Sequence, residues 1–180
     1  MWRKALIACM LVMLSNHAFA QWYSRETGQI SPDTDDLKSA DGFGGWLQLT
    51  DQVDRFLHDW NTMSTEQTPY VHTIDTTHRG GEVSALLFYV GCGGGTKVCK
   101  AKVDYKILRP DGSVYAEQRE IALSDSRVAP AHIVRLSPAI ITVRIEKSDP
   151  LGVYQILATI TEPESGQVMN LKQTFSVKAE

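Results

Sequence analysis

The 180-residue chain is poor in cysteine, in basic charge and in long apolar runs, and each shortage excludes a class of protein. It carries 18 Lys and Arg against 21 Asp and Glu, so its formal net charge is −3. A surface of this sign does not favour nucleic acid or anionic lipid, because both require a basic patch. After the first twenty residues no apolar run reaches the roughly 20 residues that a membrane helix needs. The sequence therefore predicts neither a nucleic-acid partner nor a membrane span.

Catalytic signatures are also missing. The chain contains no Gly-x-Ser-x-Gly nucleophile elbow, and pairing of its later cysteines would leave no thiol nucleophile. His72, Asp75 and His78 resemble a metal-ligand set. On one extended strand, however, the two histidines would lie roughly 20 Å apart, so a shared metal would require a turn between them. We therefore predict no enzyme activity, no catalytic residue, no metal site and no cofactor.

An export signal is present at the start of the chain. Met1-Trp2-Arg3-Lys4 is a short basic segment, an apolar run follows it, and Ala18-Phe19-Ala20 has the Ala-x-Ala pattern of a cleavage site. Lipidation at Cys9 is the alternative, but it would leave an apolar core shorter than the roughly 7–15 residues required. We predict a signal peptide over residues 1–20, cleavage after Ala20 and a periplasmic protein that begins at Gln21.

Two cysteines remain after cleavage, and they flank a glycine-rich loop. Cys92 and Cys99 enclose Gly93-Gly94-Gly95-Thr96-Lys97-Val98. An even number of cysteines in an oxidising compartment is typical of a disulfide. A metal site is the competing interpretation, but the spacing is wider than that of a zinc knuckle and no histidine lies nearby in the sequence. The pair therefore predicts a structural disulfide that closes a short loop.

The mature chain, 160 residues once 20 of the 180 are removed, has the length of one domain. Residues 21–45 are polar, with several aspartates and a glycine-rich end, which predicts an extended or mobile lead-in. Trp46–Thr50 follows as a short strand. Residues 51–60 then carry apolar side chains at helical spacing, which predicts one short helix capped by Thr50 or Asp51. A helix this short must pack its apolar stripe against the rest of the domain.

The rest of the chain has the pattern of β-strands. Apolar runs, alternating or continuous, are separated by turns such as Arg109-Pro110-Asp111-Gly112. The predicted strands cover residues 71–76, 83–90, 103–107, 114–121, 133–136, 140–145, 153–161 and 168–177. Strands at this spacing without alternating helices are typical of a sandwich.

One short motif indicates the kind of sandwich. In Asp149-Pro150-Leu151-Gly152-Val153-Tyr154, an Asp and a Gly precede a Tyr that opens an alternating strand. This is typical of the tyrosine corner of immunoglobulin-like domains, in which the phenolic hydroxyl bonds back to the backbone a few residues upstream. Asp149, Gly152 and Tyr154 are thus the fold-defining residues. We predict an all-β chain: an immunoglobulin-like antiparallel β-sandwich over residues 46–180, with one short N-terminal helix.

Three signatures together resemble an uncharacterised family of exported proteobacterial proteins with a single immunoglobulin-like domain. They are Arg79-Gly80-Gly81 before an apolar strand that ends in Gly91-Cys92, the turn Leu108-Arg109-Pro110-Asp111-Gly112-Ser113-Val114-Tyr115, and the motif that ends in Tyr154. The resemblance covers residues 46–177. It implies the sandwich fold and export, and it implies no activity.

These observations predict a non-catalytic periplasmic binding or accessory protein that recognises another protein or an envelope component. Sandwiches offer edge strands and end loops as docking surfaces. Gly93, Gly94, Gly95, Thr96 and Lys97, with Lys100 beside them, form the predicted partner-binding loop; a tolerated hairpin tip is the alternative.

A carbohydrate-directed lectin or hydrolase with an acidic cleft is the alternative from another class. Its aromatic platforms would be Trp46 and Trp60. The two hypotheses differ in one observable: the tryptophans are exposed on one face in a lectin or hydrolase, and buried in a protein-binding sandwich.

Overall fold

The computed structural model of the chain describes residues 22, 29, 31–64, 69–95, 97–125 and 133–179. The predicted signal peptide, its cleavage point and Thr96 lie outside these residues. Within the described part, no helix is long and apolar enough to cross a membrane.

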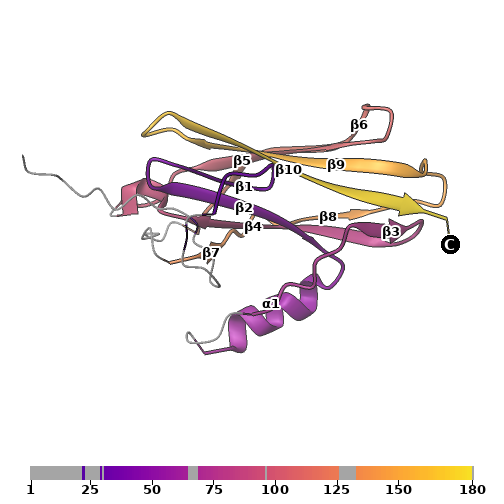
Figure 1. The fold of residues 1–180 in the computed structure, drawn as a ribbon, viewed down its shortest axis with the longest axis horizontal. Coiled ribbons are helices and arrows are strands. Elements are labelled where there is room, and N and C mark those ends of the chain that lie inside the picture. The colour runs from indigo at the N-terminus through magenta and orange to yellow at the C-terminus, as the bar shows by residue number, and fades with distance from the viewer. Residues whose placement is uncertain are drawn as a thin grey trace, which may run out of the picture.

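Two five-stranded sheets pack face to face (Figure 1). The first sheet has the order β1 (Leu37–Ala40), β2 (Phe43–Thr50) and β4 (Glu82–Val90), with β7 (Arg135–Leu136) and β8 (Ile141–Arg144) both paired to the other side of β4. The second has the order β3 (Thr76–His78), β10 (Gln167–Lys178), β9 (Gly152–Glu162), β5 (Lys102–Leu108) and β6 (Val114–Ala122). The fold is the predicted immunoglobulin-like β-sandwich. Among the described strand pairs, only β3 with β10 is parallel.

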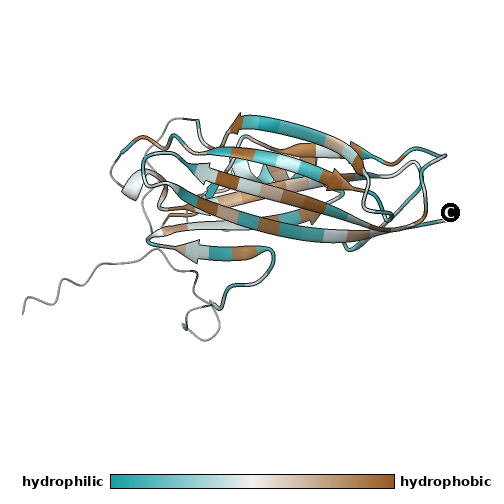
Figure 2. Cartoon of the chain, turned by 90° about the horizontal axis from the view of Figure 1, so that it is seen from above, coloured by the Kyte–Doolittle hydropathy of each residue, from teal (hydrophilic) through white to brown (hydrophobic). Residues whose placement is uncertain are grey.

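The core lies between the two sheets because their strands alternate in polarity. On β9, Tyr154, Ile156, Ala158 and Ile160 are buried, while the residues that alternate with them are more exposed. Figure 2 shows this alternation as bands of hydrophobic and hydrophilic colour along the strands. β4 differs, since every residue after Glu82 is buried, so this strand is covered on both faces. The predicted strand at residues 83–90 is thereby confirmed, and burial on both faces explains why its apolar run is continuous.

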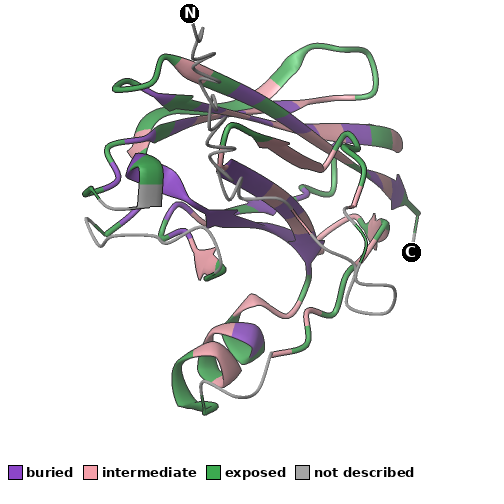
Figure 3. Ribbon diagram, turned by 60° about the vertical axis from the view of Figure 1, so that its left-hand side comes forward, coloured by how far each residue is buried: buried purple, intermediate pink, exposed green. Residues whose placement is uncertain are grey.

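The second cover of β4 is the helix α1 (Val53–Thr62), which lies outside the first sheet (Figure 3). The ring of Phe88 on β4 lies 5.8 Å from that of Phe56 and 5.7 Å from that of Trp60, measured between centroids. The predicted docking of the apolar stripe is therefore confirmed. The predicted cap is wrong: Gln52 occupies the N-cap and makes no side-chain cap bond. The Thr50 hydroxyl instead accepts the backbone N–H of Gln52 at 3.1 Å.

The first sheet also begins earlier than predicted. β1 and the first residues of β2 lie inside the stretch assigned to a mobile lead-in, with Leu37 paired to Trp46. The acidic residues of that stretch hold it in place, since Asp33 accepts the backbone N–H of Ser39 at 3.0 Å. Asp35 forms a 2.7 Å ion pair with Lys172 of β10. Residues 37–40 and 43–45, expected as part of an extended or mobile lead-in, therefore take part in the first sheet.

Candidate functional site

The fold-defining residues meet at one corner of the sandwich. Tyr154 is fully buried, and its hydroxyl donates to the carbonyl oxygen of Pro150 at 3.0 Å. The carboxylate of Asp149 accepts the backbone N–H of Glu146 and the hydroxyl of Tyr115, both at 2.7 Å. The predicted bond from Tyr154 to the upstream backbone is therefore confirmed, and Asp149 organises the turn before it.

Gly152 and Tyr115 complete this corner. Gly152 has a φ of +130°, and a Cβ there would lie 3.0 Å from Cγ of Pro110, so a glycine is required. Burial, and to a smaller extent the hydrogen bond to Asp149, raises the pKa of Tyr115 to about 12. The guanidinium of Arg109 lies 4.6 Å from the centroid of the Tyr115 ring. Each polar group at this corner has a partner inside the protein, which is the arrangement of a structural site.

The predicted partner-binding loop lies at the opposite end of the sandwich. A disulfide joins Cys92 to Cys99, as predicted, and both side chains are buried. A short 3-10 turn, Cys92–Gly95, opens the loop. Gly93 and Gly94 have φ values of +72° and +65°, in the left-handed region that favours glycine. The N–H of Lys97 donates to the carbonyl oxygen of Gly93 at 3.1 Å.

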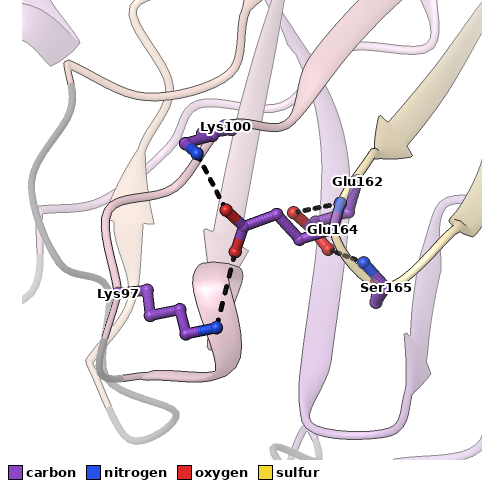
Figure 4. A network of polar contacts seen from close by, with 5 residues as sticks. All are labelled: Lys97, Lys100, Glu162, Glu164 and Ser165. Atoms are coloured by element: carbon purple, nitrogen blue, oxygen red, sulfur yellow. Dashed lines mark hydrogen bonds and ion pairs between the residues drawn. The ribbon is translucent and has the colours of Figure 1, made fainter.

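Two lysines connect this loop to the turn between β9 and β10 (Figure 4). Nζ of Lys100 lies 2.9 Å from one carboxylate oxygen of Glu164, and Nζ of Lys97 lies 3.9 Å from the other. The side chain of Lys100 is 62% exposed and that of Lys97 is 73% exposed. Both lysines therefore remain accessible to a partner while they pair with Glu164. The pairs connect the loop to the turn but add little stability, because exposed ion pairs contribute little.

Glu162 holds the other side of the same turn. Its carboxylate is buried and accepts the backbone N–H of Ser165 at 2.6 Å and that of Glu164 at 3.3 Å. Burial raises the pKa of Glu162, but the hydrogen bonds from Ser165 and Glu164, with the charge of Lys100, outweigh it and hold the pKa below its ordinary value. The turn is therefore a fixed support for the lysines.

A third connection gathers the loops of this end. The side-chain amide of Gln167 donates to the carboxylate of Asp41, in the turn between β1 and β2, at 3.4 Å. We call residues 92–100, 162–167 and Asp41, as far as the structure describes them, the end surface. Sequence reasoning found its disulfide loop but missed Glu162 and Glu164, because the bond between Lys100 and Glu164 spans 64 residues.

The two tryptophans of the carbohydrate hypothesis pack into the aromatic cluster on the outer face of the first sheet. The Trp46 ring lies 6.0 Å from that of Trp22 and 5.7 Å from that of Phe88, and the Trp60 ring lies 5.7 Å from that of Phe56. Both residues are partly buried. They support the docking of α1 and do not form an exposed platform.

The histidines are not brought together. Nδ1 of His72 lies 3.2 Å from a carboxylate oxygen of Asp51, and Nδ1 of His78 lies 2.9 Å from the carbonyl oxygen of Arg79. In the described part of the chain no group of three or more His, Cys, Asp or Glu side chains could hold a metal ion.

No protein-family model matches the chain, and no curated protein is similar to it in sequence. Among solved structures, a family 123 glycoside hydrolase from Clostridium perfringens, studied for glycolipid glycan hydrolysis, has a TM-score of 0.45 at 12% identity. The match covers 77% of this chain and 28% of the hydrolase, so the chain spans little more than a quarter of that protein. A Niemann-Pick type C2 protein from the Japanese carpenter ant has a TM-score of 0.41 at 8% identity, covering 82% and 96% of the two chains. At such scores neither likeness extends to function.

Two hollows lie on the surface of the described residues. One, of about 200 Å³, lies beside α1 and is lined by Arg55, Phe56, Asp59 and Tyr70 among others. The other, of about 190 Å³, opens between the two sheets where β6 and β8 form their edges. Both are smaller than the 300 Å³ or more of a typical pocket for a drug-sized ligand.

Proposed function

We propose that this chain is an exported, non-catalytic protein that recognises another protein through the end surface. The observation that carries the proposal is the loop between Cys92 and Cys99, which the disulfide closes. Glu164 ties Lys97 and Lys100, and Glu162 fixes the turn that holds Glu164. A loop that a disulfide closes has less conformational entropy to lose when a partner binds, which favours affinity.

Three further observations support this proposal. The disulfide suits an oxidising compartment, in agreement with the export signal and the family resemblance. Both cysteines of the described part are used in that bond, which leaves no thiol nucleophile there. The charged groups of the end surface pair with one another or with the backbone. Complementary charge patterns give protein interfaces their specificity, so a charged end surface suits the recognition of another protein.

Site-specific photo-crosslinking tests the proposal. A photoreactive residue replaces Lys97 on the end surface, and the matched control replaces Asp111, an exposed residue in the turn at the opposite end of the sandwich. We expect a discrete adduct with an envelope protein from position 97, which excess unlabelled protein competes away, and no such adduct from position 111. Equal labelling from both positions, or none from position 97, would contradict the proposal.

A further inference from the structure

The side of the sandwich holds a second feature, independent of the end surface. The hollow between β6 and β8 has apolar walls, formed by Tyr105, Ile107, Tyr115, Ile141 and Val143. All of these except Tyr115 are buried core residues, so the hollow is a continuation of the core toward solvent. Its volume of about 190 Å³ compares with the roughly 150 Å³ apolar cavity that accepts a benzene molecule. It therefore has room for one branched or aromatic side chain.

The backbone of β8 presents unpaired groups to this hollow. The N–H of Ile145 donates to the carbonyl oxygen of Gly81 at 2.9 Å, which places the backbone of Ile145 on the β4 side. Because antiparallel strands alternate in this respect, the backbone groups of Thr142 and Arg144 point away from β4. The Arg144 carbonyl confirms this direction, since it accepts the Tyr115 hydroxyl at 2.9 Å.

Three backbone groups on this edge are therefore open: the N–H and the carbonyl of Thr142, and the N–H of Arg144. Both residues are exposed and line the hollow. In the part of the chain that the structure describes, no strand pairs with this side of β8.

The side-chain polar groups of Tyr105, Thr142 and Glu117 at the hollow are already paired. The Tyr105 hydroxyl donates to the carbonyl oxygen of Ala139 at 2.8 Å, and the Thr142 hydroxyl lies 2.8 Å from that of Ser84. Glu117 forms a 2.8 Å ion pair with Arg119. A ligand must therefore make its hydrogen bonds with the strand edge and its apolar contacts with the walls. An alkyl chain would leave these three backbone groups of β8 unpaired. An extended peptide can pair with all of them, because its own backbone offers carbonyl and N–H groups in alternation.

We propose that β8 and the hollow bind an extended peptide segment, which adds as a strand to the first sheet and buries one apolar side chain. Neighbouring residues on paired strands point to the same face of a sheet. The residue opposite Val143 therefore points inward, as Val143 does, and enters the hollow. Main-chain pairing supplies affinity in this mode, and the pocket for the side chain supplies specificity.

The neighbouring edge of β6 shows why the segment pairs with β8. Glu120 has a φ of +59° and donates its backbone N–H to the carboxylate of Asp104 at 2.7 Å, where the pairing of β5 and β6 shifts register. Glu117, Arg119 and Glu120 add charge along that strand, and Glu120 pairs with Lys102 of β5. Bulges and charges of this kind protect an edge from pairing with another chain. β8 carries no bulge in its pairing with β4.

Amide exchange measured by NMR tests the proposal directly. In the free protein we expect fast exchange at Thr142 and Arg144 and slow exchange at Val143, which faces β4. The probe is a blocked hexapeptide, Ser-Val-Thr-Val-Thr-Lys, whose apolar residues alternate. We expect it to slow exchange at Thr142 and Arg144 and to bind saturably, with a Kd of about 1 mM or tighter.

Two substitutions at one position separate the edge N–H from the side chain. Thr142→Pro removes both the N–H and the hydroxyl, and proline is tolerated where an edge N–H faces outward. Thr142→Val removes the hydroxyl alone and is the control. We expect the peptide to bind at least about tenfold more weakly to the Pro variant and equally to the Val variant. If the Pro variant does not fold, Ala116→Trp, which fills the hollow from β6, must produce the same loss.

The peptide provides a control that leaves the protein unchanged. A series of peptides is prepared, each methylated at one backbone nitrogen. The peptide methylated at the nitrogen that donates to the Thr142 carbonyl should bind more weakly than the unmodified peptide. Equal binding by the Pro and Val variants, or no binding of the peptide, would overturn the proposal. Protection of Thr142 that rises with protein concentration, without peptide, would assign this edge to a second copy of the chain and would also overturn it. Binding of hexanoate without binding of the peptide would assign the hollow to alkyl ligands.

Discussion

The hydroxyl of Tyr154 donates a 3.0 Å hydrogen bond to the carbonyl oxygen of Pro150, four residues upstream. The ring of the same tyrosine stacks on Phe175 of β10, with 5.4 Å between centroids. One side chain thus fastens the turn before β9 to the core between the sheets. This arrangement separates two contributions of Tyr154 that substitutions can measure independently.

Tyr154→Phe should lower the free energy of unfolding by about 1 kcal/mol, because it removes one hydrogen bond and keeps the ring. This cost is at the lower end of the roughly 1–3 kcal/mol expected for an acceptor that loses its partner, because Pro150 is an exposed residue and the bond is only partly buried. Tyr154→Ala should cost about 3–5 kcal/mol, because it leaves a cavity in the core. Urea titrations measure both, with Tyr70→Phe as a control, since Tyr70 is 79% exposed. Equal costs for the two Tyr154 variants would contradict this account of the corner.

Gly152→Ala should be more costly than the same change at Gly166. Both glycines have positive φ, +130° and +72°, so both alanines are strained. Only at Gly152 does the new Cβ meet another group, Pro110 at 3.0 Å, while the space at Gly166 is open. We expect a loss of about 2–3 kcal/mol at Gly152 and about 1 kcal/mol at Gly166 in thermal or urea unfolding. Equal losses would mean that the approach of Pro110 is irrelevant.

The sequence predicted features that short-range patterns determine. The spacing of Phe56 and Trp60 places them on one face of a helix whatever they contact, and the motif before Tyr154 is contained in six residues. β1 was missed for the opposite reason. Leu-Lys-Ser-Ala at residues 37–40 has no clear alternation, and its partner residues on β2 stabilise it as a strand.

The candidate site shows the same division. The disulfide followed from composition and compartment, because only two cysteines remain after the predicted cleavage. The role of Glu164 could not be predicted, since its contacts with Lys97 and Lys100 depend on how two distant hairpins meet. The open edge of β8 has no sequence signal at all, because it follows from the direction of backbone groups in the sheet.

The disulfide should contribute about 2–3 kcal/mol to stability, as expected for closing a short loop in the unfolded chain. The double variant Cys92→Ala with Cys99→Ala should lower the free energy of unfolding by this amount and still fold, because the core between the sheets is large. Reduction of the wild-type protein should have a similar effect and leave the double variant unchanged. A free thiol in the oxidised protein, seen by mass spectrometry, would contradict the pairing.

Tyr115 should make the protein lose stability at alkaline pH. Burial, followed by the bond to Asp149, raises its pKa from 10.0 to about 12 in the folded state. The unfolded state therefore loses its proton first, and the contribution of Tyr115 is complete below pH 10 and is lost as the pH rises toward 12. In thermal melts from pH 8 to pH 12, the melting temperature should fall more steeply with pH for wild type than for Tyr115→Phe. Parallel curves would rule out Tyr115 as a source of the decline.

Glu162 should give the opposite dependence, at acid pH. Burial opposes its ionisation, but the backbone N–H groups of Ser165 and Glu164 and the charge of Lys100 hold its pKa below the ordinary value of 4.5. A lowered pKa in the folded state means that this stabilisation is complete above pH 4.5 and is lost as the pH falls through the folded-state pKa.

Glu162→Gln should therefore lower the free energy of unfolding by about 1–3 kcal/mol at pH 7, because two backbone donors lose a charged acceptor in a buried site. The difference from wild type should shrink as the pH falls through the folded-state pKa, below which wild type also carries a neutral side chain. Glu164→Gln is the matched control, because Glu164 lies two residues along the same turn and forms its ion pairs with exposed lysines. It should cost less than about 1 kcal/mol, an effect that salt removes. Urea titrations at pH 7 and at acid pH, each at low and high salt, measure the free energy of unfolding of the wild type and of both variants. A larger, salt-sensitive loss for Glu164→Gln than for Glu162→Gln would show that the lysine pairs, and not the buried carboxylate, hold the turn.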